Sequence, residues 1–133
     1  NSGGDNVAPA RVEGIMLLEP EIGQTLIYGD KRPYLVALIV PHQDFIRGFA
    51  RANRCSADLT ELAEDTRFKA AIGAAVTRAN SRLSAIERVR KFHVMPEAFS
   101  VDNGLMTPTL KLRRHLIVGV YRDLLEGLYG AGK

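Results

Sequence analysis

The sequence has one cysteine, no metal-binding motif and no long apolar run, and these shortages argue against several classes of protein. Cys55 cannot form a disulfide within the chain, which argues against a small disulfide-stapled secreted protein. The longest apolar run, Tyr34 to Val40, is far shorter than the roughly 18 residues that cross a bilayer. The opening residues lack the charged and apolar segments of a signal peptide, so we expect a cytoplasmic protein.

The motifs of common enzyme classes are missing as well. No CxxC pair or HExxH sequence occurs, so a metal site is not expected, and neither a GxSxG nor a P-loop pattern is present. His42, His93 and His115 are scattered along the chain, and we interpret each as structural or exposed. Cys55 has no activating neighbour in sequence and is interpreted as a small apolar residue.

The composition is that of an ordinary globular domain with a mild positive charge. The 133 residues are 46% hydrophobic and 25% charged, with a net charge of +3. Basic residues gather at 88–91 and 111–114, but aromatic residues make up only 7% of the chain and lie mostly in apolar stripes. A nucleic-acid partner is therefore not expected. A non-catalytic basic binding module remains an alternative.

Apolar spacing and turn-forming residues predict a mixture of helices and strands. The expected elements are a helix over 9–19, strands over 24–29 and 34–40, a helix over 44–53, a short helix capped by Ser56, a helix over 68–86, a strand over 91–95 and a helix over 112–128. Every residue of 34–40 is apolar, so this strand should be covered on both faces. The fold class is α+β, with a small, mostly antiparallel sheet of a hairpin plus a third strand, packed with helices.

A candidate for chemistry lies in the segment before the last helix. Residues 97–111 are expected to be irregular, with a turn at 102–104 and a stiff extended piece at 107–109. Lys111 follows this piece, and an ammonium held there could meet a phosphate or carboxylate oxygen. The pattern alone leaves open that Lys111 merely decorates the start of a helix.

Several motifs resemble one family. Thr107-Pro-Thr-Leu-Lys-Leu-Arg-Arg114 resembles the Pro-Thr-x-Lys-x-x-Arg motif near the end of adenylate-forming enzymes. Ser2-Gly-Gly-Asp-Asn-Val-Ala-Pro-Ala-Arg-Val-Glu13 resembles the segment after their interdomain hinge, in the form that long-chain fatty-acyl-CoA synthetases have. Arg32 to Pro41 and Asn80 to Phe92 are similar to the same group. The resemblance therefore covers essentially the whole chain, in the order of the family.

The resemblance implies that residues 1–133 are the small, mobile C-terminal domain of an AMP-forming long-chain fatty acid–CoA ligase. Such an enzyme converts ATP and a fatty acid into an acyl-adenylate and then uses CoA to form the thioester. The large N-terminal domain, with its ATP, Mg²⁺ and acyl sites, is not in this sequence, so the chain alone is expected to be inactive. A ligase for another carboxylic acid is the alternative within this family. Peripheral membrane association of the full enzyme is a further expectation.

The resemblance also assigns residues. Lys111 would be the catalytic lysine of the adenylation step. Gly3 and Gly4 would lie in the loop along the CoA pantetheine, and Arg113 and Arg114 would face the nucleotide or the large domain. The wider superfamily often has glycine before the motif lysine where this chain has Leu110, so we expect the loop to hold Leu110 without a positive φ.

Overall fold

The computed structural model describes residues 7–130, and residues 1–6 and 131–133 lie outside the description. Gly3 and Gly4, predicted to lie along the CoA pantetheine, therefore fall outside the described residues. In chain order the elements are α1 (Pro9–Met16), β1 (Ile22–Tyr28), β2 (Leu35–Pro41), α2 (Gln43–Asn53), α3 (Leu59–Leu62), α4 (Thr66–Asn80), a 3-10 turn η1 (Ala85–Glu87), β3 (Val89–Val94), α5 (Arg114–Val120) and α6 (Arg122–Gly127).

The three strands form one small sheet in the order β1-β2-β3. β1 and β2 are antiparallel, which confirms the predicted hairpin. β2 and β3 are parallel, because the chain crosses through α2, α3 and α4 before it returns to the sheet. The α+β class and the three strands are confirmed, but the sheet is mixed rather than mostly antiparallel.

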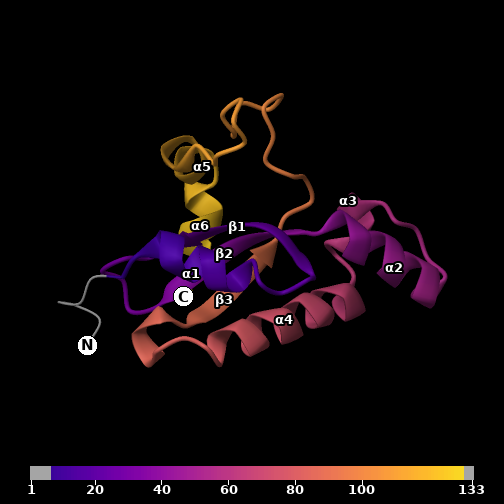
Figure 1. Cartoon of the computed structure of the whole chain (residues 1–133), viewed down its shortest axis with the longest axis horizontal. Coiled ribbons are helices and arrows are strands. Elements are labelled where there is room, and N and C mark those ends of the chain that lie inside the picture. The colour runs from indigo at the N-terminus through magenta and orange to yellow at the C-terminus, as the bar shows by residue number, and fades with distance from the viewer. Residues whose placement is uncertain (1–6, 131–133) are drawn as a thin grey trace.

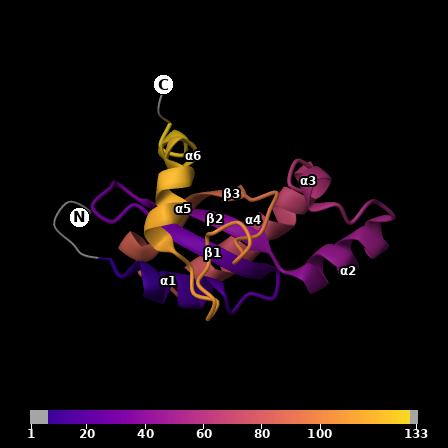
Figure 2. The same ribbon diagram turned by 90° about the horizontal axis from the view of Figure 1, so that it is seen from above.

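Helices cover both faces of the sheet (Figures 1 and 2). α1 and α4 pack on one face, α5 and α6 pack on the other, and α2 and α3 lie beyond one end. All seven residues of β2 are buried, as its unbroken apolar run predicted. Its side chains alternate between the two faces, with Leu35, Ala37 and Ile39 toward α1 and α4, and Val36, Leu38 and Val40 toward α5 and α6.

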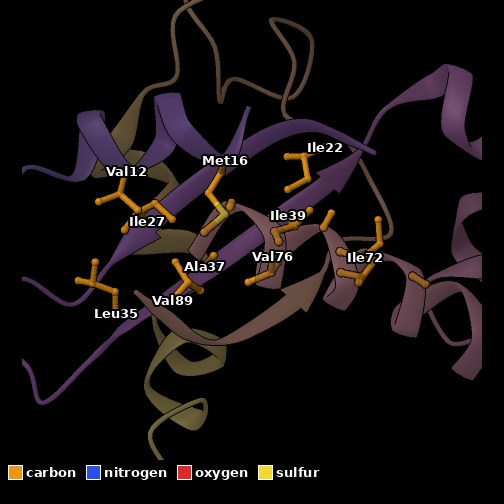
Figure 3. Packing of buried hydrophobic residues seen from close by; sticks show 14 of the residues in the cluster. Val12, Met16, Ile22, Ile27, Leu35, Ala37, Ile39, Ile72, Val76 and Val89 are labelled. Atoms are coloured by element: carbon orange, nitrogen blue, oxygen red, sulfur yellow. The ribbon is translucent and has the colours of Figure 1, made fainter. Parts of the chain in front are cut away.

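The larger core cluster joins α1 and α4 to the sheet (Figure 3). Met16 of α1, Ile39 of β2 and Ile72 of α4 are each fully buried within it. Burial of side chains of this size contributes about 1.5–3 kcal/mol each. This layer therefore fixes α1, whose C-terminal end borders the candidate site.

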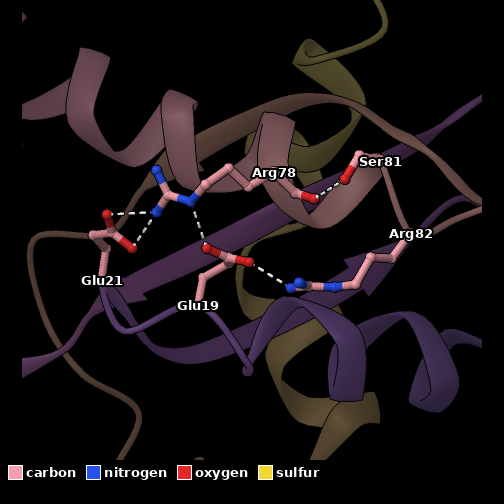
Figure 4. A network of polar contacts seen from close by, with 5 residues as sticks. All are labelled: Glu19, Glu21, Arg78, Ser81 and Arg82. Atoms are coloured by element: carbon pink, nitrogen blue, oxygen red, sulfur yellow. Dashed lines mark hydrogen bonds and ion pairs between the residues drawn. The ribbon is translucent and has the colours of Figure 1, made fainter.

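A polar network ties the segment after α1 to α4 (Figure 4). Glu19 is 5% exposed, and its carboxylate accepts hydrogen bonds from Arg78, with Nε 2.7 Å away, and from Arg82. Arg78 also binds Glu21, with Nη2 2.6 Å from its carboxylate. The Arg78 guanidinium lowers the pKa of Glu19, so the buried carboxylate stays charged and paired.

The long central helix ends earlier than predicted. The apolar spacing suggested a helix through residue 86, but α4 ends at Asn80. The Asn80 side chain donates to the Val89 carbonyl and accepts from the Val89 amide, both at 2.9 Å, so it pairs with the start of β3. Leu83 remains buried after the helix ends, whereas Ile86 is partly exposed.

Two further helix predictions need correction. The short helix α3 is capped by Asp58, whose side chain accepts from the Thr60 amide, and not by Ser56. The last helix, expected over 112–128, is divided into α5 and α6 at Tyr121, which has φ −108° and ψ 21°. The Tyr121 ring packs against Phe99 of the preceding loop, a long-range contact that local periodicity does not contain.

Candidate functional site

Lys111 lies at the end of a tight hairpin rather than after an extended piece. The Thr107 carbonyl accepts from the Leu110 amide at 2.8 Å, and this closes a turn with Pro108 at its second position. The Thr107 amide donates to the Lys111 carbonyl at 2.8 Å, and the Lys111 amide donates to Thr107 Oγ1 at 3.1 Å. Met106 and Leu112 form an antiparallel bridge below it. The hairpin therefore fixes the backbone of Lys111.

Leu110 has φ +66°, which contradicts the expectation that the loop holds it without a positive φ. A three-residue hairpin loop usually places its third residue in the left-handed region, where glycine is favoured. Leu110 takes that position between Thr109 and Lys111 and is 67% exposed. A leucine there costs roughly 1–2 kcal/mol of strain.

The loop is anchored to β1 by Gln24, a residue that the sequence analysis did not select. Gln24 Nε2 donates to the Phe99 carbonyl at 3.0 Å and to Met106 Sδ at 3.2 Å, and Gln24 Oε1 accepts from the Phe99 amide at 2.9 Å. The predicted turn at 102–104 is confirmed, and Asn103 closes it by accepting from the Ser100 amide at 2.9 Å. Gln24 therefore holds the loop against β1 at two points, Phe99 and Met106.

The other end of the hairpin is anchored by Arg114. Its guanidinium makes two hydrogen bonds with the Glu13 carboxylate of α1, at 2.6 and 2.7 Å. Glu13 is 8% exposed and also accepts from the Ile27 amide of β1 at 2.9 Å. The hydrogen bond that Arg114 donates to the Glu13 carboxylate raises the pKa of Arg114. The Arg114 side chain thus joins α1, β1 and α5, and its predicted contact with nucleotide or large domain stays a prediction.

The remaining cations of the segment are exposed. The Lys111 ammonium has no hydrogen bond or ion pair among residues 7–130, and Lys111 is exposed. The Arg113 guanidinium makes one long contact, 3.4 Å to the Gly104 carbonyl, and its contact with nucleotide also stays a prediction. Lys111 is therefore the cation that this hairpin presents for contact with an anion.

An open groove of about 590 Å³ lies beside the hairpin, between α1 and β1. Leu17, Leu110, Lys111 and the Glu13–Arg114 pair contribute to its lining. The groove combines apolar surface with one cation that has no partner in the described part of the chain. Its composition suits contact with a surface that is apolar around an anionic centre.

The other residues considered from sequence lie apart from this groove. His42 caps α2 by accepting from the Asp44 amide at 3.0 Å, His93 lies half-buried on β3, and His115 is exposed on α5. Burial lowers the pKa of His93. Cys55 is half-buried against the core. Residues 7–130 contain no group of three His, Cys, Asp or Glu side chains that could hold a metal ion.

Comparison with known proteins gives a consistent family. The model of the AMP-binding enzyme C-terminal domain matches residues 1–133. The chain is 35% identical over 130 residues to the long-chain-fatty-acid–CoA ligase FadD15 of Mycobacterium tuberculosis, covering 96% of this chain and 22% of the relative. It is 32% identical over 133 residues to long-chain-fatty-acid–CoA ligase 1 of Cavia porcellus, covering 98% of this chain and 19% of the relative.

A solved structure extends the comparison to three dimensions. The adenylation domain of a carboxylate reductase from Mycobacterium chelonae matches with a TM-score of 0.76 and 26% identity, covering 97% of this chain and 19% of that chain. The chain spans about a fifth of the length of the curated relatives it matches. The described fold is therefore that of one part of a larger enzyme architecture.

Proposed function

The chain belongs to the family of AMP-binding enzyme C-terminal domains, and from this premise we propose that it is the small domain of an AMP-forming long-chain fatty acid–CoA ligase. The alignment of almost the whole chain with two relatives named as long-chain-fatty-acid–CoA ligases supports this proposal. Under this proposal, a large N-terminal domain binds ATP and the fatty acid, and the complete enzyme forms an acyl-adenylate and then acyl-CoA. The likeness to the adenylation domain of a carboxylate reductase favours a second candidate, a domain that activates another carboxylic acid.

Lys111 carries the proposed chemistry. Its exposed ammonium would contact the fatty acid carboxylate and an α-phosphate oxygen of ATP, which would hold two anions together and offset the charge that develops during transfer. The hairpin bonds between Thr107 and Lys111 fix the backbone from which this side chain extends. The observation that supports this role is an exposed lysine with no ionic partner among residues 7–130, on a braced hairpin at the family motif.

The other groups of the reaction belong to the same proposal. Gly3 and Gly4 would border the CoA pantetheine, and Arg113 and Arg114 would face the nucleotide or the large domain. Mg²⁺, which would neutralise phosphate charge, is assigned to the large domain. The described residues offer no cluster of ligands for it.

Location is a separate proposal. We propose a cytoplasmic enzyme whose fatty substrate brings it to membrane surfaces as a peripheral protein. Among residues 7–130, no helix is both long enough and apolar enough to cross a bilayer.

The test is a comparison of the two half-reactions in the full-length enzyme. Acyl-adenylate formation from ATP, Mg²⁺ and palmitate is measured separately from thioester formation, which starts from preformed acyl-adenylate and CoA. Lys111→Ala is expected to slow the first step by a hundredfold or more, about 3 kcal/mol of transition-state stabilisation, and to spare the second. Lys69→Ala, which removes an exposed lysine of α4, is the matched control and should leave both steps unchanged. Equal rates for Lys111→Ala and the native enzyme in both steps would remove Lys111 from the mechanism.

A further inference from the structure

Two exposed leucines line the same groove as Lys111, although neither belongs to the core. Leu17 follows the last turn of α1 and is 46% exposed, and Leu110 at the hairpin tip is 67% exposed. Both side chains line the groove beside the hairpin, and Lys111 lines it as well. Apolar side chains left open on two separate segments of one groove indicate a surface that something else covers.

The backbone at Leu110 strengthens this indication. Its φ of +66° is unfavourable for a branched side chain, and glycine would adopt it without strain. The exposed Leu110 side chain contributes little burial to the described fold in return. The described fold therefore gives no reason for a leucine at this position.

The position of Leu110 restricts what can cover it. It directly precedes Lys111 in the chain and lines the same groove, so any surface that the Lys111 ammonium reaches must also come close to Leu110. Under the proposed function, that surface holds ATP and the fatty acid. This chain aligns with 22% of the FadD15 relative, which leaves about four-fifths of such an enzyme to supply the surface.

We propose that Leu110 and Leu17 are apolar anchors that dock the hairpin on the large domain in the orientation that brings Lys111 to the reactants. The inference rests on the proposed function and deepens it. Leu110 and Leu17 are positioning residues in this account: they contact the large domain, whereas Lys111 contacts the substrates. The occupant of the groove is thus an apolar surface of the large domain that surrounds the bound anions.

The chain offers a matched control for exposure. Leu18 is next to Leu17 and is 64% exposed, but it does not line the groove. Both are exposed leucines in the turn after α1, so the proposal predicts that the same substitution has different effects at the two positions.

The test uses the full-length enzyme and the two half-reactions. Leu110→Ala and Leu17→Ala are each expected to lower kcat of acyl-adenylate formation at least tenfold, with KM for ATP and palmitate within twofold of native, because the large domain binds both substrates. Thioester formation from preformed acyl-adenylate should stay within twofold of native. Leu110→Met should restore most of the adenylation rate, and Leu18→Ala should leave it unchanged.

Leu110→Gly separates docking from stability. It relieves the left-handed strain, so the melting temperature of the enzyme should not fall, while adenylation should slow as it does in Leu110→Ala. If Leu110 had a purely structural role, the melting temperature and the adenylation rate would change in the same direction. Native adenylation in Leu110→Ala, an equal loss in Leu18→Ala, or an equal loss in both half-reactions would each overturn the inference.

The outcome also distinguishes this inference from the proposed function. If Lys111→Ala abolishes adenylation while Leu110→Ala and Leu17→Ala have no effect, the docking inference alone fails. If Lys111→Ala itself leaves adenylation intact, the proposed role of the hairpin fails first.

Discussion

Replacing Glu13 with alanine is expected to lower the unfolding free energy of the 133-residue chain by about 3 kcal/mol. The Glu13 carboxylate accepts from the Ile27 amide at 2.9 Å, and Ile27 is only 2% exposed. An unsatisfied buried amide costs about 2 kcal/mol. The Arg114 side chain is 38% exposed, so water can replace its lost partner, and the broken ion pair adds only about 1 kcal/mol.

Urea unfolding followed by circular dichroism measures this loss. Glu13→Gln retains an oxygen that can accept from the Ile27 amide, so it should cost about 1 kcal/mol, close to the ion-pair part alone. Glu64→Ala removes an exposed carboxylate and should change stability by no more than about 0.5 kcal/mol. The reasoning is refuted if Glu13→Ala costs no more than Glu64→Ala while the dependence of free energy on urea concentration is unchanged.

Two further predictions concern the region where α6 meets the β1–β2 turn. The Arg32 guanidinium lowers the pKa of Glu126 from 4.5 to about 2, so the contribution of Glu126 to stability should be complete above pH about 4.5 and lost as the pH falls toward 2. Glu126→Gln should therefore flatten the fall in unfolding free energy between pH 5 and pH 3, and an unchanged acid profile contradicts this. Gly29→Ala should destabilise the chain by roughly 3 kcal/mol in urea unfolding, because Gly29 has φ +122° and an added Cβ meets the Tyr129 hydroxyl. Gly48→Ala, in the open interior of α2, should instead stabilise by up to about 1 kcal/mol, and equal effects at the two glycines would refute the steric argument.

The sequence predicted the elements whose signals are local. The unbroken apolar run of β2 and the three- and four-residue spacing from Phe68 located a strand and a helix correctly. Local spacing could not show where α4 ends, because Asn80 pairs with Val89 in the next strand. It also could not show that β3 is parallel to β2, since orientation depends on the path of the whole crossover.

The sequence likewise identifies only part of the candidate site. The local pattern around Lys111 fits both a catalytic lysine and an ordinary surface lysine. The resemblance to the family motif is what favours the catalytic role. Glu13 and Gln24 were missed as anchors of the loop because their partners are distant in sequence: the residue numbers of Glu13 and Arg114 differ by 101, and those of Gln24 and Phe99 differ by 75. The prediction that Leu110 avoids a positive φ is wrong. A three-residue hairpin loop usually places its third residue in the left-handed region, and Leu110 is that residue.

The double anchoring of the hairpin also has a consequence for the free energy of engagement. Gln24 holds the segment before the hairpin and Glu13 holds the arginine after it, so folding of the domain orders the backbone of residues 107–111 in advance. Ordering one residue from a flexible chain costs about 1–2 kcal/mol, so a loose loop of this length would lose roughly 5–10 kcal/mol each time it engaged its target. In this chain that loss is part of folding, so under the proposed function the ordered hairpin would engage the reactants and leave them again without repeating it.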